Sequence, residues 1–370
     1  MYPFRETEGT AVLLLPACRA VELSLDSESG WTNPVLRKPD VAGFNNPIPN
    51  MNAFLCGGAG FIGGHLSARL LADPAVERVV VYDNFSSGDR RLLSGSLASP
   101  KFALVEGDIR DVGLLSRSME GADVVYHLAA NPDIARAARE PDIDFHAGTA
   151  LTQMVLEAMR LNRVAKIFFT SGSGVYGEDP EMEFREDHGP LHPISPYGAS
   201  KLASEAMICA YCHMFGLRGR VFRFANVVGP SQTHGVGHDF LRRLRQDPSR
   251  LVVLGDGRQS KSYIHIDDVL DAIHFVDART DAKYCVHNVA TGDYITVREI
   301  AEMAVLVSGL QPSAVRVEYT GGDRGWNGDV PVIRFNLDRI SCLGWKARWG
   351  SREAVRMALA AMHREMMLAP

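Results

Sequence analysis

Apolar and polar residues alternate along this chain with two distinct periods from residue 51 onward. Short, nearly continuous apolar runs predict buried parallel strands at 53–55, 78–82, 102–105, 123–128, 165–170 and 220–224. Between these runs, apolar residues recur at helical spacing, most clearly over 66–71, 150–161 and 196–215. Strands that alternate with helices in this way predict a doubly wound α/β fold, with helices on both faces of a parallel sheet.

The pattern changes at both ends of this alternating region. After Gly229 and Pro230 the predicted strands become short and loops more frequent. This change predicts a smaller α/β lobe over residues 229–370 that mainly binds a substrate, with some return of the chain to the first domain. The first fifty residues contain scattered prolines and no sustained period, so we expect residues 1–50 to form a poorly ordered extension and Met51 to be the natural start.

The composition argues against several classes of protein. The formal net charge of −5 is mild and indicates no nucleic-acid partner. No apolar run is long enough to cross a bilayer, so no membrane partner is expected. Six cysteines lie far apart except for Cys209 and Cys212, which have no second pair to complete a zinc site. We therefore expect free thiols, no metal and a location in the reducing cytoplasm.

Residues 56–66 form a glycine-rich segment between the first strand and the next helix. Glycines at 57, 60 and 63 permit a tight turn, close approach of the backbone to a pyrophosphate, and close packing of helix on strand. The second strand ends at Asp83, twenty residues after Gly63. A carboxylate there can accept hydrogen bonds from an adenosine ribose and would repel a 2′-phosphate, so the pattern predicts an NAD-binding Rossmann domain over residues 51–228. A glycine-rich turn that binds nothing is the alternative.

A tyrosine and a lysine four residues apart, Tyr197 and Lys201, lie at the start of a predicted helix. Residues at this spacing share one helix face. An ammonium beside a phenol favours the phenolate, so we expect Lys201 to lower the pKa of Tyr197 toward neutrality. Such a phenolate can take a proton from an alcohol while hydride leaves the same carbon for a nicotinamide. A surface contact would explain the spacing alone, but the dinucleotide pattern upstream favours catalysis.

From residue 51 to about 345 the chain resembles the extended short-chain dehydrogenases/reductases, specifically the NAD-dependent nucleotide-sugar epimerases and dehydratases. The motifs that carry the resemblance lie at residues 57–63, 82–84, 107–111, 127–130, 175–177, 197–201, 223–230 and 263–268. Together these motifs are specific for the family and far less specific for the substrate. The resemblance also implies a homodimer that forms through two helices of the Rossmann domain.

The resemblance implies a role for each residue that matches a family motif. The residues that would bind NAD are Gly57, Gly60, Phe61, Ile62, Gly63, Asp83, Asn84, Ser86, Gly88, Asp108, Ile109, Leu128, Ala129, Ala130, Tyr197, Lys201 and Phe224. The residues that would bind a nucleotide-diphosphate sugar are Asn226, Val252, Leu254, Lys261, Arg324 and Asp329. The family usually has an arginine where this chain has Lys261, and a lysine can meet a phosphate only as a point charge.

One departure from the family pattern concerns a catalytic hydroxyl. The family carries a serine or threonine four residues before the tyrosine of its Val-Tyr-Gly motif, and this chain has Gly172 there. Ser171 and Ser173 flank that position and would point away from its face on an extended strand. Ser173 is our candidate for the third catalytic residue, because the glycines around it allow the backbone to turn. If neither hydroxyl reaches the substrate, the protein would be inactive or run a modified reaction.

The same segment discriminates among the reactions of the family. The sugar 4,6-dehydratases carry Asp-Glu just after their catalytic threonine as the acid and base for water loss, whereas this chain has Ser173 and Gly174. The sequence therefore favours an NAD-dependent epimerase of a nucleotide-diphosphate sugar, acting at C4 through a transient 4-keto intermediate. A keto-sugar reductase of the same fold and a weakly active NAD-binding regulatory protein are the alternatives.

Overall fold

The computed structural model describes residues 10–13, 21–24, 50–326 and 328–368. Most of the extension predicted over residues 1–50 lies outside the described residues. Within it, strands β1 (Thr10–Leu13) and β2 (Val21–Ser24) form an antiparallel pair.

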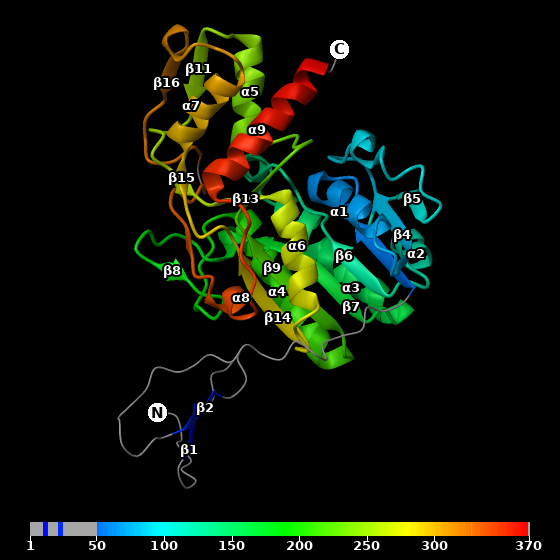
Figure 1. The fold of residues 1–370 in the computed structure, drawn as a ribbon. Helices are drawn as coiled ribbons and strands as arrows, with labels where there is room; N and C mark the ends of the chain where they lie inside the picture. Colours follow the sequence, from blue (N-terminus) through cyan, green and yellow to red (C-terminus); the bar gives the residue numbers. More distant parts are fainter. Residues whose placement is uncertain (1–9, 14–20, 25–49, 327, 369–370) are drawn as a thin grey trace.

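Seven parallel strands form the central sheet, which confirms the predicted doubly wound fold (Figure 1). In chain order they are β3 (Met51–Cys56), β4 (Val76–Asp83), β5 (Phe102–Glu106), β6 (Val124–His127), β7 (Lys166–Gly172), β9 (Arg218–Phe224) and β14 (Tyr284–Val289). Their order across the sheet is β14-β9-β7-β6-β3-β4-β5. The winding direction therefore reverses between β3 and β6, and the crevice at such a reversal is where open α/β sheets bind ligands.

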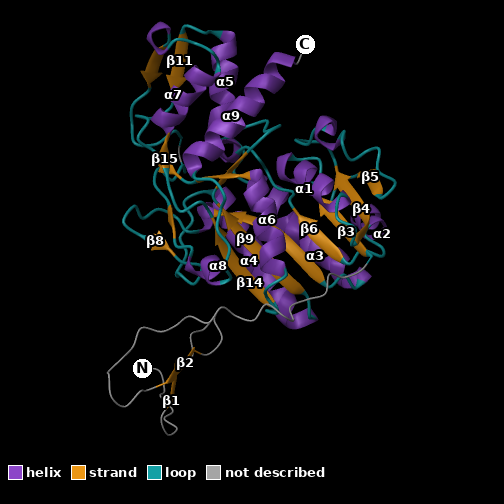
Figure 2. Ribbon diagram, viewed as in Figure 1, coloured by secondary structure: helices purple, strands orange, loops and turns teal. Residues whose placement is uncertain are grey.

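Helices cover both faces of this sheet (Figure 2). One face is packed by α1 (Phe61–Leu71) and α6 (Ile266–Asp277), the other by α2 (Val112–Ser118), α3 (Ala150–Asn162) and α4 (Pro196–Phe215). Successive strand residues serve opposite faces: in β3, Leu55 joins the core under α1 and α6, whereas Phe54 joins the core under α3 and α4. Two buried faces explain why the strands read as continuous apolar runs.

Several elements begin at other residues than the sequence predicts, among them α1 and β9. Helix α1 begins at Phe61, directly after the glycine turn, rather than at residue 66. Strand β9 begins at Arg218 rather than at residue 220, and it buries Arg220 completely. The Arg220 guanidinium donates hydrogen bonds to Asp277 and to the carbonyls of Thr280 and Ala282, and these partners allow a charged side chain to be buried on an inner strand of the sheet.

The smaller lobe, at the top of Figure 1, has a hydrophobic core of its own that the buried residues define. Its helices are α5 (Val236–Gln246), α7 (Val297–Val307) and α9 (Ser351–Leu368), and its parallel strand pair is β11 (Arg250–Val253) with β16 (Arg316–Tyr319). Short strand pairs link it to the main domain: β10 (Asn226–Val228) with β13 (Tyr263–His265), β12 (Ser260–Lys261) with β15 (Ile295–Thr296), and β8 (Glu183–Phe184) with β17 (Arg334–Phe335). Between these segments the chain returns to the main domain as α6 and β14, and again as α8 (Asp338–Cys342), which packs on β14.

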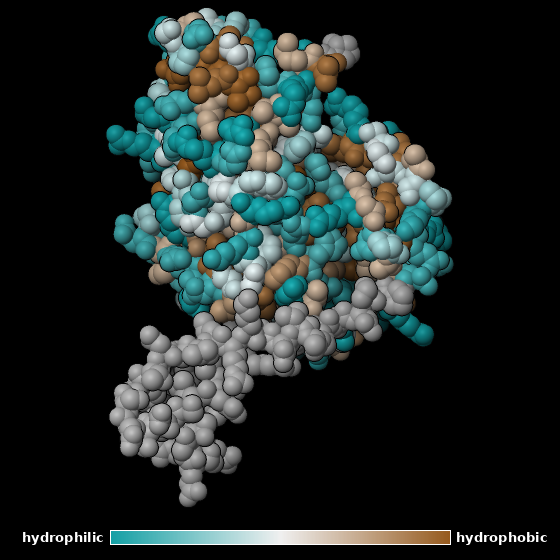
Figure 3. All heavy atoms as spheres, viewed as in Figure 1, coloured by the Kyte–Doolittle hydropathy of each residue, from teal (hydrophilic) through white to brown (hydrophobic). Residues whose placement is uncertain are grey.

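Polar residues cover most of the molecular face seen in Figure 3, with an apolar patch at the top of the smaller lobe. In the described part of the chain, every helix is too short or too polar to cross a membrane.

Close packing at the glycine turn makes a stability prediction. A Cβ on Gly63 would lie 2.6 Å from the Cα and the carbonyl oxygen of Gly58, which are backbone atoms with little room to move. We expect Gly63→Ala to lower the free energy of unfolding by about 1–3 kcal/mol, as overpacking does. Urea denaturation measures this change. The control is Gly95→Ala, where a Cβ meets nothing within 4 Å; equal stability of the two variants would contradict the prediction.

Candidate active site

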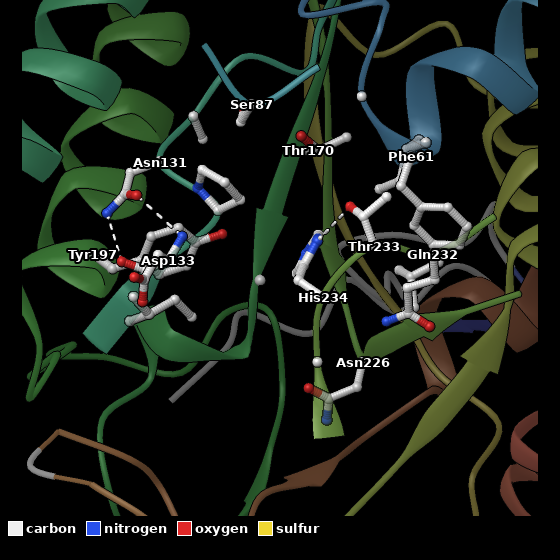
Figure 4. Close-up of a pocket in the computed structure, with 18 of the residues that line it drawn as sticks. Phe61, Ser87, Asn131, Asp133, Thr170, Tyr197, Asn226, Gln232, Thr233 and His234 are labelled. Atoms are coloured by element: carbon white, nitrogen blue, oxygen red, sulfur yellow. Dashed lines mark hydrogen bonds between the residues drawn. The ribbon is translucent and has the colours of Figure 1, made fainter. Parts of the chain in front are cut away.

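A cleft of about 1420 Å³ opens at the carboxyl ends of the central strands and continues into the smaller lobe. Every residue predicted to bind NAD lines it, from Gly57 in the glycine turn to Phe224 at the end of β9. Figure 4 shows Tyr197 grouped with Asn131 and Asp133 on one side of the view, and Gln232, Thr233 and His234 on the other.

The glycine turn shapes one end of the cleft for a dinucleotide. Gly57 has a φ of +76°, and a Cβ on it would lie 2.6 Å from the backbone nitrogen of Ala129 on the facing loop. Gly60 is the N-cap residue of helix α1, and no side chain of the described residues caps this helix. Gly60 and the first residues of α1 line the cleft, and an uncapped helix start there suits a pyrophosphate.

The acidic residues beside the turn are held in place for a ribose and a base. Asp83 accepts hydrogen bonds from the backbone N–H groups of Ala59 (2.9 Å) and Phe85 (2.8 Å), which orients its carboxylate at the cleft wall. Asp108 accepts a hydrogen bond from Asn84 at 2.9 Å, and the Arg110 guanidinium beside it holds its pKa well below the usual range. The room that the glycines leave, the N–H groups at the start of α1 and the Asp83 carboxylate together fit NAD.

The candidate catalytic couple, Tyr197 and Lys201, stands at the start of α4. Ser195 caps this helix by accepting a hydrogen bond from the N–H of Gly198 at 3.1 Å, and Pro196 occupies the first turn. The Lys201 ammonium lies 5.5 Å from the centre of the Tyr197 ring and donates to the carbonyl of Thr170 at 2.7 Å. The structure therefore brings Tyr197 and Lys201 together on the helix face that borders the cleft.

The electrostatics of the couple differ from the expectation. In the chain by itself, burial raises the pKa of Tyr197 to about 12, and the negative charge of Asp144 adds to the effect. Burial lowers the pKa of Lys201 to about 8, against the opposing charges of Glu205 and Asp144. The expected lowering of the Tyr197 pKa is wrong for the chain alone, because burial of the phenol and the charge of Asp144 both raise this pKa.

The hydroxyls of segment 170–174 divide between the core and the cleft. Ser171 is 5% exposed and donates to the Glu205 carboxylate on α4. Gly172 has an extended backbone with φ of −160°. Ser173 lines the cleft, and no described residue makes a hydrogen bond to its hydroxyl. Of the two serines that flank Gly172, Ser173 is the one whose hydroxyl is left for a ligand.

The substrate end is assembled in part as expected. Asn226, Leu254, Lys261 and Asp329 line the cleft, and Lys261 forms an ion pair with Asp329. Val252 and Arg324 do not line it. Val252 lies in β11, and its carbonyl accepts a hydrogen bond from Arg243. Arg324 instead forms ion pairs with Glu178 and Asp323.

Several lining residues were not singled out by the sequence. Asn131, His234 and Trp326 all border the cleft. Asn131 directly follows the His127-Leu128-Ala129-Ala130 motif, so its position was a usable signal. Trp326 lies in a glycine-rich stretch close to Asp329, but no periodic pattern marks that stretch as part of a site.

Comparisons with known proteins agree with this geometry. The family described as "NAD dependent epimerase/dehydratase family" matches residues 53–290. The UDP-glucose 4-epimerase of Mycolicibacterium smegmatis is 36% identical over 257 residues, which cover 68% of this chain and 80% of that protein. The dTDP-glucose 4,6-dehydratase of an Actinoplanes species is 30% identical over 296 residues, covering 78% of this chain and 92% of that one.

Solved structures give the same result. A crystal structure of UDP-galactose 4-epimerase aligns with a TM-score of 0.75 and 34% identity, covering 85% of this chain and all of that one. The Thermus thermophilus UDP-glucose 4-epimerase in complex with NAD aligns with a TM-score of 0.73 and 30% identity, covering 84% of this chain and 99% of that one. The chain therefore belongs to the NAD-dependent epimerase/dehydratase family, with NAD as its cofactor.

Proposed function

We propose that this protein is an NAD-dependent epimerase that inverts C4 of a nucleotide-diphosphate sugar. The observation that carries the proposal is the composition of one cleft wall. There the Tyr197–Lys201 couple stands next to segment 170–174, which offers hydroxyl groups and no carboxylate. Relatives that are named epimerases support this proposal. A 4,6-dehydratase is also among the relatives, and the Asp-Glu pair that such dehydratases carry is replaced here by Ser173 and Gly174, which favours epimerisation over dehydration.

The chain's own residues account for the proton steps. Tyr197 takes the proton of the C4 hydroxyl as the C4 hydride departs, which leaves a 4-keto sugar. Bound NAD supplies the hydride acceptor and a positive ring charge that favours the phenolate. The keto sugar turns about its diphosphate link and presents its other face. Tyr197 then returns the proton to the oxygen as hydride is restored to C4, and the configuration is inverted.

Lys201 supports these steps from a fixed position. Its hydrogen bond to the Thr170 carbonyl anchors the ammonium to the end of β7. With a pKa lowered to about 8, Lys201 still carries its charge at neutral pH. That charge favours the phenolate as it forms, and it lies at the cleft wall where a nicotinamide ribose would be held.

The reaction itself is tested with a panel of UDP-, GDP- and dTDP-hexoses. We expect at least one of these sugars to give a product inverted at C4 by NMR, with no net gain or loss of NADH, because the hydride is returned in each turnover. Purified protein should retain NAD. A 4-keto-6-deoxy product would instead show a dehydratase, and steady consumption of NAD(P)H would show a reductase.

Removal of the Tyr197 hydroxyl tests the proposed acid and base. We expect Tyr197→Phe to lower kcat by about 10²–10⁴-fold, the usual contribution of a positioned general acid–base group. Bound NAD should remain, since the ring and Lys201 stay in place. Tyr211→Phe is the matched control, because Tyr211 lies on the same helix and is not among the residues lining the cleft. Equal kcat in the two variants would remove Tyr197 from the mechanism.

A swap of hydroxyls tests Ser173. We expect Ser173→Ala to lower kcat by about 10²-fold, comparable to the loss of a positioned donor. Adding Gly172→Ser to that variant should restore activity in part, because a Cβ at 172 meets only the Phe224 carbonyl, at an ordinary 3.8 Å. Full activity of Ser173→Ala alone would show that the Ser173 hydroxyl is not needed for the reaction.

A further inference from the structure

Trp326 is one of two aromatic residues that line the cleft and keep part of their surface exposed. Among the described phenylalanines, tyrosines and tryptophans of the cleft wall, Tyr197 and Trp326 are only partly buried. The others are buried and form part of the packing around the cleft: Phe61, Tyr82, Phe224, Phe240 and Tyr263. The proposed reaction uses Tyr197 and leaves the exposed indole of Trp326 without a function.

Trp326 lies between two anchored residues, Arg324 and Asp329. Arg324 forms an ion pair with Glu178, a residue of the main domain, at 3.2 Å. The N–H of Asp329 donates to the carbonyl of Trp326 at 3.1 Å, and the buried Asp329 carboxylate accepts a hydrogen bond from the N–H of Gly325 at 3.2 Å. These contacts hold the backbone on both sides of the indole at the cleft wall.

The packing of Gly328 shows which part of the cleft the indole reaches. A Cβ on Gly328 would lie 3.1 Å from Cζ3 of Trp326 and 3.4 Å from Cβ of Ser195. Gly328 is therefore next to both the six-membered ring of the indole and the residue that caps α4. Tyr197 follows Ser195 by two residues, so the edge of the indole lies at the end of the cleft where the sugar must meet the phenol.

On its other side, the same stretch of chain borders Leu254 in the smaller lobe. A Cβ on Gly325 would lie 3.7 Å from Cβ of Leu254. Leu254 lines the cleft and is 45% exposed, so it offers a second apolar surface there. The chain from Gly325 to Gly328 thus connects the smaller lobe with the start of α4, and the ring edge of Trp326 lies toward α4.

A partly exposed indole at this position suits a hexose ring. Both faces of such a ring carry C–H groups, and an apolar surface gains free energy when these groups displace water from it. This contact has no fixed direction, unlike a hydrogen bond, so it can serve the ring in more than one orientation. The proposed reaction needs that property, because the keto sugar turns over and presents its two faces in succession at one site.

We propose that Trp326 binds the hexose ring of the substrate through the apolar surface of its indole and so determines the affinity for the sugar part. This inference rests on the proposed epimerase function, in which the sugar lies beside Tyr197. Other residues of the cleft bind the nucleotide part. Loss of the indole therefore weakens the binding of a sugar nucleotide more than the binding of the nucleotide alone.

The test compares a nucleoside diphosphate with its hexose ester by calorimetry on NAD-saturated protein. UDP, dTDP and GDP are each titrated beside their glucose esters, and the pair that binds most tightly to the unmodified protein is used. We expect Trp326→Ala to raise the Kd of the sugar nucleotide by about 10-fold, the upper range for one aromatic contact, and to change the Kd of the nucleotide by less than about 2-fold. Trp326→Phe keeps a smaller ring and should give an intermediate Kd for the sugar nucleotide.

Trp349→Ala is the matched control, because Trp349 is a partly buried indole that is not among the residues lining the cleft, and both Kd values should stay unchanged. If Trp326→Ala does not fold, Trp326→Gln removes the apolar surface in its place. Equal weakening of both ligands, or no weakening in folded protein, would overturn the role of Trp326. Because no turnover is measured, a wrong reaction leaves this result intact. Absence of binding by every pair would overturn this role together with the proposed function.

Discussion

A buried ion pair fastens helix α4, which carries Tyr197 and Lys201, to the central sheet. Arg223 on β9 donates to both carboxylate oxygens of Glu205 on α4, with 2.7 Å between Nη2 and Oε2, and both side chains are almost fully buried. Ser171 at the end of β7 donates its hydroxyl to the same carboxylate. Loss of one partner would leave a buried charge unpaired at a cost of about 3–5 kcal/mol. Lys201 and Tyr197 precede Glu205 by one and two helical turns, so this pair determines where the couple stands relative to the strand ends.

The burial that positions the couple also determines its charge. Removal from water favours the neutral form of each group, so the pKa of Lys201 falls to about 8 while that of Tyr197 rises to about 12. Glu205 and Asp144 support the ammonium, and Asp144 opposes the phenolate. The chain therefore provides a charged lysine beside a protonated phenol. A phenol can take a proton from an alcohol only as the phenolate, and the positive charge of a bound nicotinamide would favour that form.

Prediction from the sequence succeeded where the signal was local. The strand–turn–helix pattern around Gly57 and Gly63 and the helix over 196–215 depend on short-range periodicity and on glycine geometry, and the structure places them as expected. The burial of Arg220 inside β9 could not be predicted, because the residues that bond to its guanidinium lie about sixty residues away in the chain. The burial of Asp144 could not be foreseen either, because its backbone carbonyl meets the Ser200 hydroxyl, which lies more than fifty residues along the chain. The expected pKa of Tyr197 failed because spacing reveals a neighbouring charge but not the loss of solvent.

The two ends of the cleft are prepared to different degrees. At the NAD end, glycine space, exposed N–H groups and an oriented Asp83 are already in place and need no rearrangement. At the substrate end, Lys261 is already paired with Asp329, and Arg324 pairs with Glu178 without lining the cleft. A phosphate that approached Lys261 would therefore have to displace the Asp329 carboxylate. Exchange of one ion pair for another adds little net affinity, but it rejects ligands whose charge is misplaced.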